Sequence, residues 1–314
     1  MASTTIGKAA AIIRKGDIVA FPTETVYGLG ANALDAKAVA KIFTAKGRPA
    51  DNPIIVHVSD MKMLKSVVRN ISPAARRLMK RFWPGPLTIL FPKSERVPAI
   101  VTAGLSTVAV RMPNHKVALA LIKSTGVPIA APSANMSGRP SPTTAAHVRQ
   151  DFLRLAIIDG GPTAHGLEST VVSVDGHPCV FRLGAITLEE LREAVPDIAV
   201  AKHTAKRPAS PGMKHKHYAP DKPLILFPLN KRKLLLRYAK YCDSPVILCS
   251  EKELRYFKEF LTVSLGKTDK EIAKNVFAAL RTKKGKILLV LGVQKRGLGR
   301  AVMDRLERAA SKKF

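Results

Sequence analysis

The sequence predicts a mixed protein of the α/β or α+β class with about two domains. Short β-branched runs alternate with helical patterns through the first two thirds of the chain, as expected of such a fold. The chain has 314 residues, which is enough for roughly two domains. Hydrophobic residues make up 46% of it, close to the average of globular proteins, and this excludes a disordered basic protein or a histone-like tail.

Local patterns predict the elements of the first part in chain order. Residues 17–21 (DIVAF) are a short apolar run that stops at Pro22, as expected of a buried strand. From Asp35, an expected N-cap, apolar residues recur at helical spacing as far as Gly47, with Pro49 just beyond, so we predict an amphipathic helix there. Further strands are predicted at residues 53–58, 87–91, 108–111, 127–130, 156–159 and 169–174.

A polar, basic segment punctuated by prolines separates the two parts of the chain. We interpret residues 203–220 as a linker between a first domain at 1–202 and a second at 221–314. The second part alternates strand patterns with helical ones, which predicts a small, Rossmann-like βαβαβα unit. Its strands are expected at residues 223–227, 245–249 and 286–291, and its helices at 231–241, 269–281 and 298–310.

The formal net charge is +29, from 52 Lys and Arg against 23 Asp and Glu. A field of this size suits a nucleic-acid partner, because phosphate groups attract clustered cations. Only 5% of the residues are aromatic, which leaves few stacking platforms for a protein that binds single strands. The excess of cations is spread over both parts of the chain, so one catalytic pocket does not account for all of it.

Cysteine usage and hydropathy bear on the cellular compartment. No apolar stretch reaches the ~18 residues of a membrane span, and no signal peptide is visible near the N-terminus. Cys179, Cys242 and Cys249 are odd in number and lack C-x-x-C spacing, so they fit neither a disulfide framework nor a zinc site. These features predict a cytoplasmic protein with no membrane partner.

Two glycine-containing segments fall short of the known phosphate-binding loops. Gly28 and Gly30 lack the third glycine of a dinucleotide-binding fingerprint. Residues 266–268 (GKT) are preceded by Leu261 at the position where a P-loop needs its first glycine. We interpret both segments as turns.

Two other loops carry groups that suit anionic ligands. Lys46 and Arg48 flank Gly47 where the predicted helix ends, although cations and glycine are also common at helix C-termini for structural reasons. Residues 131–142 (APSANMSGRPSP) follow a predicted buried strand, at the strand end where open α/β sheets usually bind ligands. An ordinary Ser/Pro turn before a helix is the alternative for this loop.

A series of motifs in collinear order carries a resemblance to a known family. In the first part they are FPTETVYGLG at 21–30, KGRP at 46–49, NPIIVHV at 52–58, WPGPLT at 83–88, VAVRMP at 108–113, APSAN at 131–135, ESTVV at 168–172 and RLGAI at 182–186. SPGMKHKHYAP at 210–220 and GLGRAVMDRL at 297–306 continue the series. With these motifs the chain resembles the YrdC-like threonylcarbamoyl-AMP synthases in their two-domain form.

The resemblance implies a YrdC-like first domain, with a twisted, mixed, open sheet and a large cavity. It implies synthesis of threonylcarbamoyl-AMP from L-threonine, bicarbonate or CO2 and ATP, with release of pyrophosphate. The product serves modification of the adenosine next to the anticodon of tRNA, through a downstream tRNA threonylcarbamoyl transferase complex. Such a reaction needs positioning and cations rather than a covalent nucleophile.

By the same resemblance, the expected site residues fall into three groups. The catalytic residues are Lys46, Arg48, Ser133 and Asn135. The residues that bind L-threonine are Thr25, His57, Arg111, Ala131 and Ser169. The residues that bind ATP are Arg48, Asn52, Thr107, Ser133, Ser141, Arg182 and Tyr218. The linker at 203–220 is expected to act as a lid over the active site.

The sequence shows no acidic cluster that would hold a metal, so Mg2+ is expected to be carried by the phosphates of ATP. Two alternative functions stay open. One is an RNA-binding module for tRNA without catalysis, which the charge favours, and weak tRNA binding is also compatible with the synthase. The other is a related carbamoyltransferase, but enzymes of that kind bring Cys-rich zinc modules that three scattered cysteines cannot supply.

Overall fold

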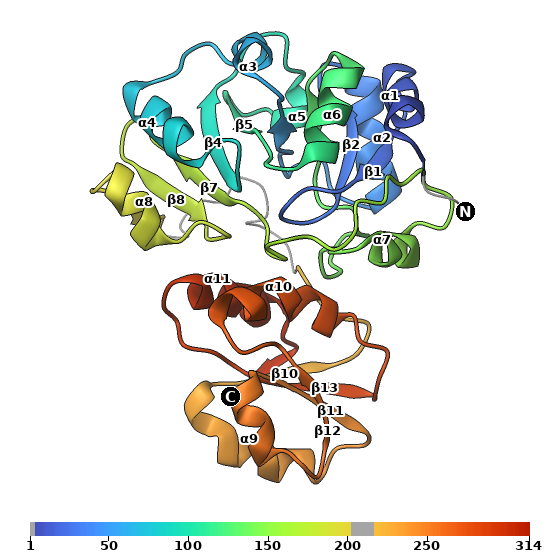
Figure 1. The fold of residues 1–314 in the computed structure, drawn as a ribbon, viewed down its shortest axis with the longest axis vertical. Helices are drawn as coiled ribbons and strands as arrows, with labels where there is room; N and C mark the ends of the chain where they lie inside the picture. The colour runs from blue at the N-terminus through green and yellow to red at the C-terminus, as the bar shows by residue number, and fades with distance from the viewer. Residues whose placement is uncertain (1–3, 202–216) are drawn as a thin grey trace. The chain divides into compact units, whose positions relative to one another are not determined.

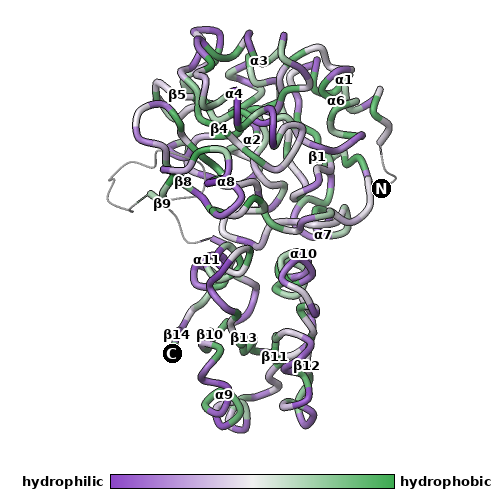
Figure 2. Tube along the Cα trace, turned by 60° about the vertical axis from the view of Figure 1, so that its left-hand side comes forward, coloured by the Kyte–Doolittle hydropathy of each residue, from purple (hydrophilic) through white to green (hydrophobic). Residues whose placement is uncertain are grey.

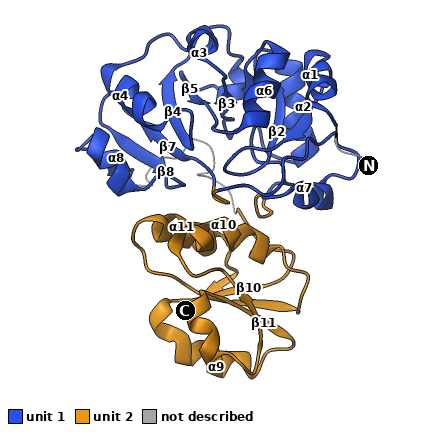
Figure 3. Ribbon diagram, in the orientation of Figure 1, with its two compact units in different colours: residues 1–137, 142–164, 168–214 blue, residues 138–141, 165–167, 215–314 orange. Residues whose placement is uncertain are grey.

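The computed structural model describes residues 4–201 and 217–314. The chain divides into two compact units, which Figure 3 shows in different colours. Unit 1 comprises residues 1–137, 142–164 and 168–214, and unit 2 comprises residues 138–141, 165–167 and 215–314. Most of the predicted linker and lid at 203–220 lies outside the described residues.

Within residues 4–201, a nine-stranded sheet runs in the order β1-β2-β6-β3-β5-β4-β7-β8-β9 (Figure 1). The sheet is mixed, because β3 with β5, β4 with β7 and β8 with β9 are parallel pairs, whereas the other neighbours are antiparallel. The mixed sheet that the motifs imply is therefore confirmed. The strands are β1 Val19–Phe21, β2 Gly28–Asn32, β3 Val56–His57, β4 Leu87–Pro92, β5 Thr107–Arg111, β6 Ile129–Ala130, β7 Thr170–Ser173, β8 Cys179–Arg182 and β9 Ala199–Val200.

Helices pack against both faces of this sheet. Helices α1 and α6 pack against each other and bury Phe21 and Ile129 on one face, while α2 and the main core occupy the opposite face. Buried apolar side chains on these helices provide most of the free energy that holds them to the sheet. The helices are α1 Ile6–Arg14, α2 Ala36–Lys46, α3 Met61–Val67, α4 Pro73–Phe82, α5 Ala99–Thr102, α6 Lys116–Thr125, α7 Ala145–Asp151 and α8 Leu188–Ala194.

Helix α2 confirms the prediction made from its capping residues. The Asp35 side chain accepts hydrogen bonds from the backbone N–H groups of Lys37 and Ala38, which satisfies two donors of the first turn. Gly47 ends the helix in the left-handed conformation, with φ of 58°, where glycine carries no steric penalty. The cap therefore places Lys46 in the last helical turn and Arg48 at the start of the following loop.

Two local predictions are wrong. Gly28 and Gly30 lie in strand β2 rather than in a turn. A Cβ atom on Gly30 would lie 2.7 Å from Cε1 of Phe21 and 2.8 Å from Cγ2 of Ile129, so only glycine leaves room for these two side chains. Residues 156–159 form a single bridge, from Ile157 to Ala20, instead of a strand, because their neighbour β1 is only three residues long.

Unit 2 contains a five-stranded sheet within residues 217–314, in the order β12-β11-β13-β10-β14, and all its neighbouring strands are parallel. Helix α9 covers one face, and α10 and α11 pack together on the other (Figure 1). The strands are β10 Leu224–Phe227, β11 Pro245–Cys249, β12 Leu261–Ser264, β13 Ile287–Leu291 and β14 Lys312–Lys313. The helices are α9 Arg232–Ala239, α10 Asp269–Leu280 and α11 Leu298–Ala309, with short 3-10 helices η1 Leu229–Lys231 and η2 Glu251–Tyr256.

The α/β nature of the second part is confirmed, but two of its strands were not predicted. Figure 2 shows hydrophobic residues along β10 and β13, in the middle of unit 2. Both strands are covered on two faces, and such strands appear in a sequence as continuous apolar runs. Strand β12 is partly exposed and β14 consists of two exposed lysines, so neither has an apolar pattern that would reveal it.

Candidate active site

Two of the expected threonine-binding residues lie at the ends of neighbouring central strands. His57 ends β3, Arg111 ends β5, and the two residues are direct partners in the parallel pair. Val56 and Val110, which precede them, point into the main core. Because side chains alternate along a strand, His57 and Arg111 point to the opposite face of the sheet.

Arg111 is the most constrained residue of this face and is only 3% exposed. Its Nη1 donates a hydrogen bond to Oγ1 of Thr25 over 2.8 Å, and its Nε donates to the carbonyl of Gly85 over 3.1 Å. Its Nη2 lies 2.6 Å from Oε1 of Glu24. A guanidinium has five N–H groups, so the contacts within the described residues leave donors for a ligand carboxylate.

Glu24 is a site residue that was not predicted, although it lies within the motif at 21–30. Besides Arg111, its Oε1 accepts a hydrogen bond from the backbone N–H of Asn114 over 2.9 Å. Its Oε2 is buried and has no hydrogen-bond partner among the described residues. Burial opposes ionisation, but the charge of Arg111 and the hydrogen bonds outweigh it, so the pKa of Glu24 lies below its usual value. The only sequence signal was an acidic residue between two threonines in an otherwise apolar stretch.

His57 is buried and uncharged. Burial, together with the positive charge of Arg111, lowers its pKa to about 3, although Glu24 acts in the opposite direction. The ring lies edge-on to Phe21, with centroids 6.1 Å apart, and its Nδ1 has no hydrogen-bond partner within the part of the chain that the structure describes. A neutral imidazole can donate or accept a hydrogen bond, which suits a hydroxyl group.

Lys46 connects the two loops that the sequence singled out. Its side chain is buried, and its Nζ donates hydrogen bonds of 2.5 Å to the carbonyls of both Ser133 and Asn135. The backbone N–H of Ser137 also donates to the carbonyl of Lys46 over 2.9 Å. The same loop begins at Ala131, whose N–H donates to the carbonyl of Ile55 over 2.9 Å. All four expected catalytic residues therefore lie near these two connected loops.

Arg48 donates hydrogen bonds to the backbone of the segment that leads into β3. Its Nη2 donates to the carbonyl of Asn52 over 3.2 Å and to that of Pro53 over 3.1 Å. Asn52 is fully buried, which is unusual for a polar side chain. The structure thus brings together Arg48 and Asn52, two of the expected ATP-binding residues.

Arg182 contacts the serine that is expected to bind threonine. Its Nε and Nη2 donate to the carbonyl of Ser169 over 3.1 and 2.9 Å, and Nη2 also lies 3.0 Å from the Ser169 hydroxyl. That hydroxyl lies 2.7 Å from Oγ1 of Thr88 in β4, a buried residue that was not predicted as part of the site. Thr88 lies in the motif WPGPLT, but nothing in the sequence indicated that it contacts Ser169.

One expected ATP-binding residue of unit 1, Thr107, is not gathered with this group. Thr107 begins β5 while Arg111 ends it, and four steps of about 3.3 Å separate their backbones by about 13 Å. Ser141 and Tyr218 belong to unit 2. There Tyr218 is 6% exposed, its ring stacks on Phe277 with centroids 5.2 Å apart, and the Arg305 guanidinium lies 5.4 Å from its centre.

Among the residues that the structure describes, no group of three or more His, Cys, Asp or Glu side chains is placed to hold a metal ion. Glu24, a buried carboxylate of the site, forms an ion pair with Arg111. No helix in the described residues is both long and apolar enough to cross a membrane.

Two family models match the chain one after the other. A family model described as telomere recombination matches residues 11–184, and one described as threonylcarbamoyl-AMP synthase, C-terminal domain, matches residues 186–311. The threonylcarbamoyl-AMP synthase of Pyrococcus abyssi is 48% identical over 316 residues, which cover 96% of this chain and 93% of that protein. The threonylcarbamoyl-AMP synthase of Bacillus subtilis is 44% identical over 320 residues, which cover 97% of this chain and 92% of that protein.

The similarity extends to three dimensions. The crystal structure of P. abyssi Sua5 complexed with L-threonine matches with a TM-score of 0.90 and 43% identity, over 98% of this chain and 96% of that one. Escherichia coli YciO matches 57% of this chain and 88% of its own, with a TM-score of 0.52 and 26% identity. Two family models in tandem, and relatives aligned over nearly the whole length, lead to one conclusion: the chain belongs to the threonylcarbamoyl-AMP synthase family, in its two-domain form.

Proposed function

We propose that this protein condenses L-threonine, bicarbonate or CO2 and ATP into L-threonylcarbamoyl-AMP and releases pyrophosphate. The observation that carries the proposal is the buried Lys46, whose Nζ joins the end of α2 to the loop of Ser133 and Asn135. A buried cation between two polar loops suits a reaction in which negative charge develops on a phosphate. Membership of the family supports the same reaction.

In the proposed reaction, an oxygen of threonine carbamate attacks the α-phosphorus of ATP. A new P–O bond forms as the bond to the β-phosphate oxygen breaks, and the electron pair leaves with pyrophosphate. Lys46 and Arg48 stabilise the charge that develops on the phosphate oxygens, because cations in a site with little water act strongly there. Ser133 and Asn135 orient the carbamate and the phosphate, and no covalent nucleophile takes part.

Threonine binding is assigned to the face that carries His57 and Arg111. Arg111 has the geometry to bind the threonine carboxylate through its remaining N–H groups. His57 is neutral, and its Nδ1 has no hydrogen-bond partner among the described residues, so it is suited to the threonine hydroxyl. Thr25, Ala131 and Ser169 complete the set, and the relative from P. abyssi that was crystallised with L-threonine supports the assignment.

ATP is assigned to Arg48, Asn52, Thr107, Ser133, Ser141, Arg182 and Tyr218. Mg2+ would be held mainly by the phosphates of the nucleotide, where it would neutralise negative charge, since the described residues offer no cage of carboxylates. The product would pass to a tRNA threonylcarbamoyl transferase complex, with weak tRNA binding by this chain. Free thiols at Cys179, Cys242 and Cys249 support a cytoplasmic location.

The test is release of pyrophosphate from ATP and bicarbonate, with threonine compared with serine and valine. We expect turnover with threonine and much less with the other two, because serine lacks the methyl group and valine lacks the hydroxyl. No threonine-dependent release, with tRNA still bound, would favour the RNA-binding module. Transfer of a carbamoyl group to a different acceptor would favour the related carbamoyltransferase.

A pair of lysines on α2 gives a matched test of the catalytic assignment. Lys46→Met removes the buried cation, and we expect pyrophosphate release to fall by roughly 100-fold or more. Lys41→Met is the control, because Lys41 is on the same helix but half-exposed and paired with Asp17. Equal activity in the two variants would contradict the role of Lys46.

A further inference from the structure

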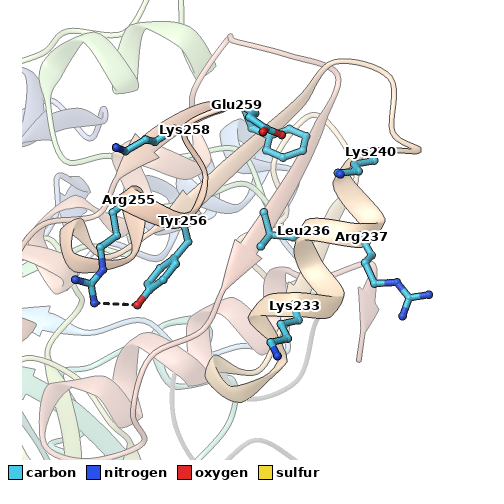
Figure 4. A pocket seen from close by; sticks show the side chains of 9 residues that line it. Lys233, Leu236, Arg237, Lys240, Arg255, Tyr256, Lys258 and Glu259 are labelled. Atoms are coloured by element: carbon cyan, nitrogen blue, oxygen red, sulfur yellow. Dashed lines mark hydrogen bonds between the residues drawn. The ribbon is translucent and has the colours of Figure 1, made fainter.

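A pocket in unit 2 has no part in the proposed reaction. It has a volume of about 620 Å³ and lies between α9 and the segment from Arg255 to Phe260. Figure 4 shows the side chains of Lys233 and Leu236 on α9 and of Lys240, which directly follows this helix, with Arg255 and Tyr256 across from them. A volume of this size is in the range of ligand-binding pockets, roughly 300–1,000 Å³.

The helical side of the pocket carries a stripe of cations. The stripe consists of Lys233, Arg237 and Lys240, with the apolar Leu236 between them. Their spacing of i, i+3, i+4 and i+7 places the four residues along one side of the helix. From Lys233 to Lys240 the helix rises about 10 Å. A nucleic-acid strand places one phosphate about every 3.4 Å along its axis, so the stripe is long enough for about three phosphates.

The cations of the pocket are not neutralised. Lys233, Arg237, Lys240, Arg255 and Lys258 line it with a single carboxylate, Glu259, and within the described residues none of the five forms an ion pair.

Several other cations of unit 2 are paired. Lys286 lies 2.6 Å from Asp243, and Lys295 lies 2.6 Å from Glu307. Glu253, close in sequence to the pocket wall, is taken up by Arg232 over 2.8 Å. Among the described residues, the pocket therefore gathers five cations without ion pairs on one concave surface.

Aromatic rings line the same pocket. Tyr256 is 37% exposed, and Phe260 is partly buried. Arg232 lies over the Tyr256 ring at 3.6 Å from its centre, and Arg255 donates to the Tyr256 hydroxyl over 2.8 Å, so this ring is fixed in place. Rings beside cations are the combination on which unpaired bases stack while their phosphates are neutralised.

We propose that this pocket binds RNA, with the cations of α9 along the phosphodiester backbone and the rings against bases. A chain of phosphates is favoured over a compact anion because the cations extend along a full stripe and across to the opposite wall. The choice of tRNA as the RNA rests on the proposed function, in which tRNA is the final acceptor. The cations of the pocket account for part of the net charge of +29.

The test uses the full chain and an unmodified tRNA transcript, with binding measured by fluorescence anisotropy from about 50 to about 200 mM salt. We expect Lys233→Gln with Lys240→Gln to weaken binding about tenfold or more. We also expect the slope of log affinity against log salt to fall by about 1.5 to 2, because two phosphate contacts are lost. Pyrophosphate release without tRNA is expected to stay unchanged, so the two proposals fail separately.

The matched control is Lys270→Gln with Lys284→Gln, which removes the same charge from exposed lysines of unit 2 outside the pocket. Equal weakening by both pairs would overturn the proposal, because net charge alone would then explain binding. Unchanged binding in the pocket variant would also overturn it. Displacement of all bound tRNA by ATP, at ATP concentrations that saturate this pocket, would also overturn it, because the occupant would then be a free nucleotide.

Discussion

At the scale of single residues, the site depends on buried charges that neutralise one another. Arg111 and Glu24 are both nearly inaccessible to water, and each would be costly to bury alone. Burial as a pair keeps both charged and fixes the Arg111 plane against Thr25. Among the described residues, one carboxylate oxygen of the pair has no hydrogen-bond partner and lies beside a guanidinium, a pattern complementary to an amino acid.

Glu24→Gln tests this pair. The amide keeps the shape but removes the charge, so Arg111 loses its counter-ion, and we expect the free energy of unfolding at pH 7 to fall by about 3 kcal/mol. The pKa of Glu24 is lowered on folding, so its stabilisation is present above its ordinary pKa of 4.5 and is lost as pH falls below it. The difference from wild type should therefore shrink in acid, as measured by urea unfolding.

The exposed Glu95, which pairs with Arg69, provides the control for Glu24. Glu95→Gln should change stability by less than about 1 kcal/mol, because surface ion pairs contribute little. A Glu24 variant as stable as the Glu95 variant would show that the buried pair is not important for the fold.

His57 makes stability depend on pH. The folded protein keeps this ring neutral down to about pH 3, whereas the unfolded chain takes up a proton near the ordinary pKa of 6.5. Stability should therefore fall between pH 6.5 and 3, by about 1.4 kcal/mol per pH unit from this residue. His57→Gln should flatten that slope, and His177→Gln at an exposed position should leave it unchanged. Parallel pH profiles for wild type and His57→Gln would contradict the assignment.

At the scale of elements, helix-capping residues and side-chain size explain where helices and strands occur. Helix α2 was predictable because Asp35 and Gly47 act through their own backbone neighbourhood. Strand β2 was not, because its Gly30 is required by Phe21 and Ile129, which come from other strands. A local sequence pattern does not reveal that a residue must be small to leave room for a side chain from another strand.

Gly30→Ala tests the explanation for β2. The added Cβ would lie within 3 Å of two side chains, so we expect a loss of about 1 to 3 kcal/mol in the free energy of unfolding. Gly7→Ala in α1 is the control, since nothing lies within 4 Å of its added Cβ, and it should stabilise the helix by about 0.5 to 1 kcal/mol. If both variants stabilise the protein, the steric explanation is wrong.

At the scale of the whole molecule, the two units have separate cores and separate sheets. The two-domain form is confirmed by the two family models, whereas the boundaries at 202 and 221 and the lid stay predictions. Tyr218, which was expected to cover the nucleotide, is packed inside unit 2 against Phe277 and Arg305. A substitution at Tyr218 therefore measures how much this packing contributes to the stability of unit 2.

Tyr218→Ala should lower the free energy of unfolding of unit 2 by about 3 to 5 kcal/mol, because a buried ring is removed. Tyr218→Phe keeps the ring and its stacking and should remain close to wild type in stability. Calorimetry on the full chain checks both variants. Equal melting of the alanine and phenylalanine variants would show that the stacking on Phe277 contributes little.

The order of the amino acids was sufficient to predict the family, the mixed sheet, the capped helix α2 and the apolar strands β10 and β13. Each depends on neighbours along the chain or on motifs that need no partner to be recognised. The contacts of the site depend instead on residues far apart: Lys46 and Ser133 are separated by 87 positions, and Thr25 and Arg111 by 86. A buried polar group must find a partner wherever the fold supplies one, so Glu24 and Thr88 became visible as site residues only when the strands were side by side.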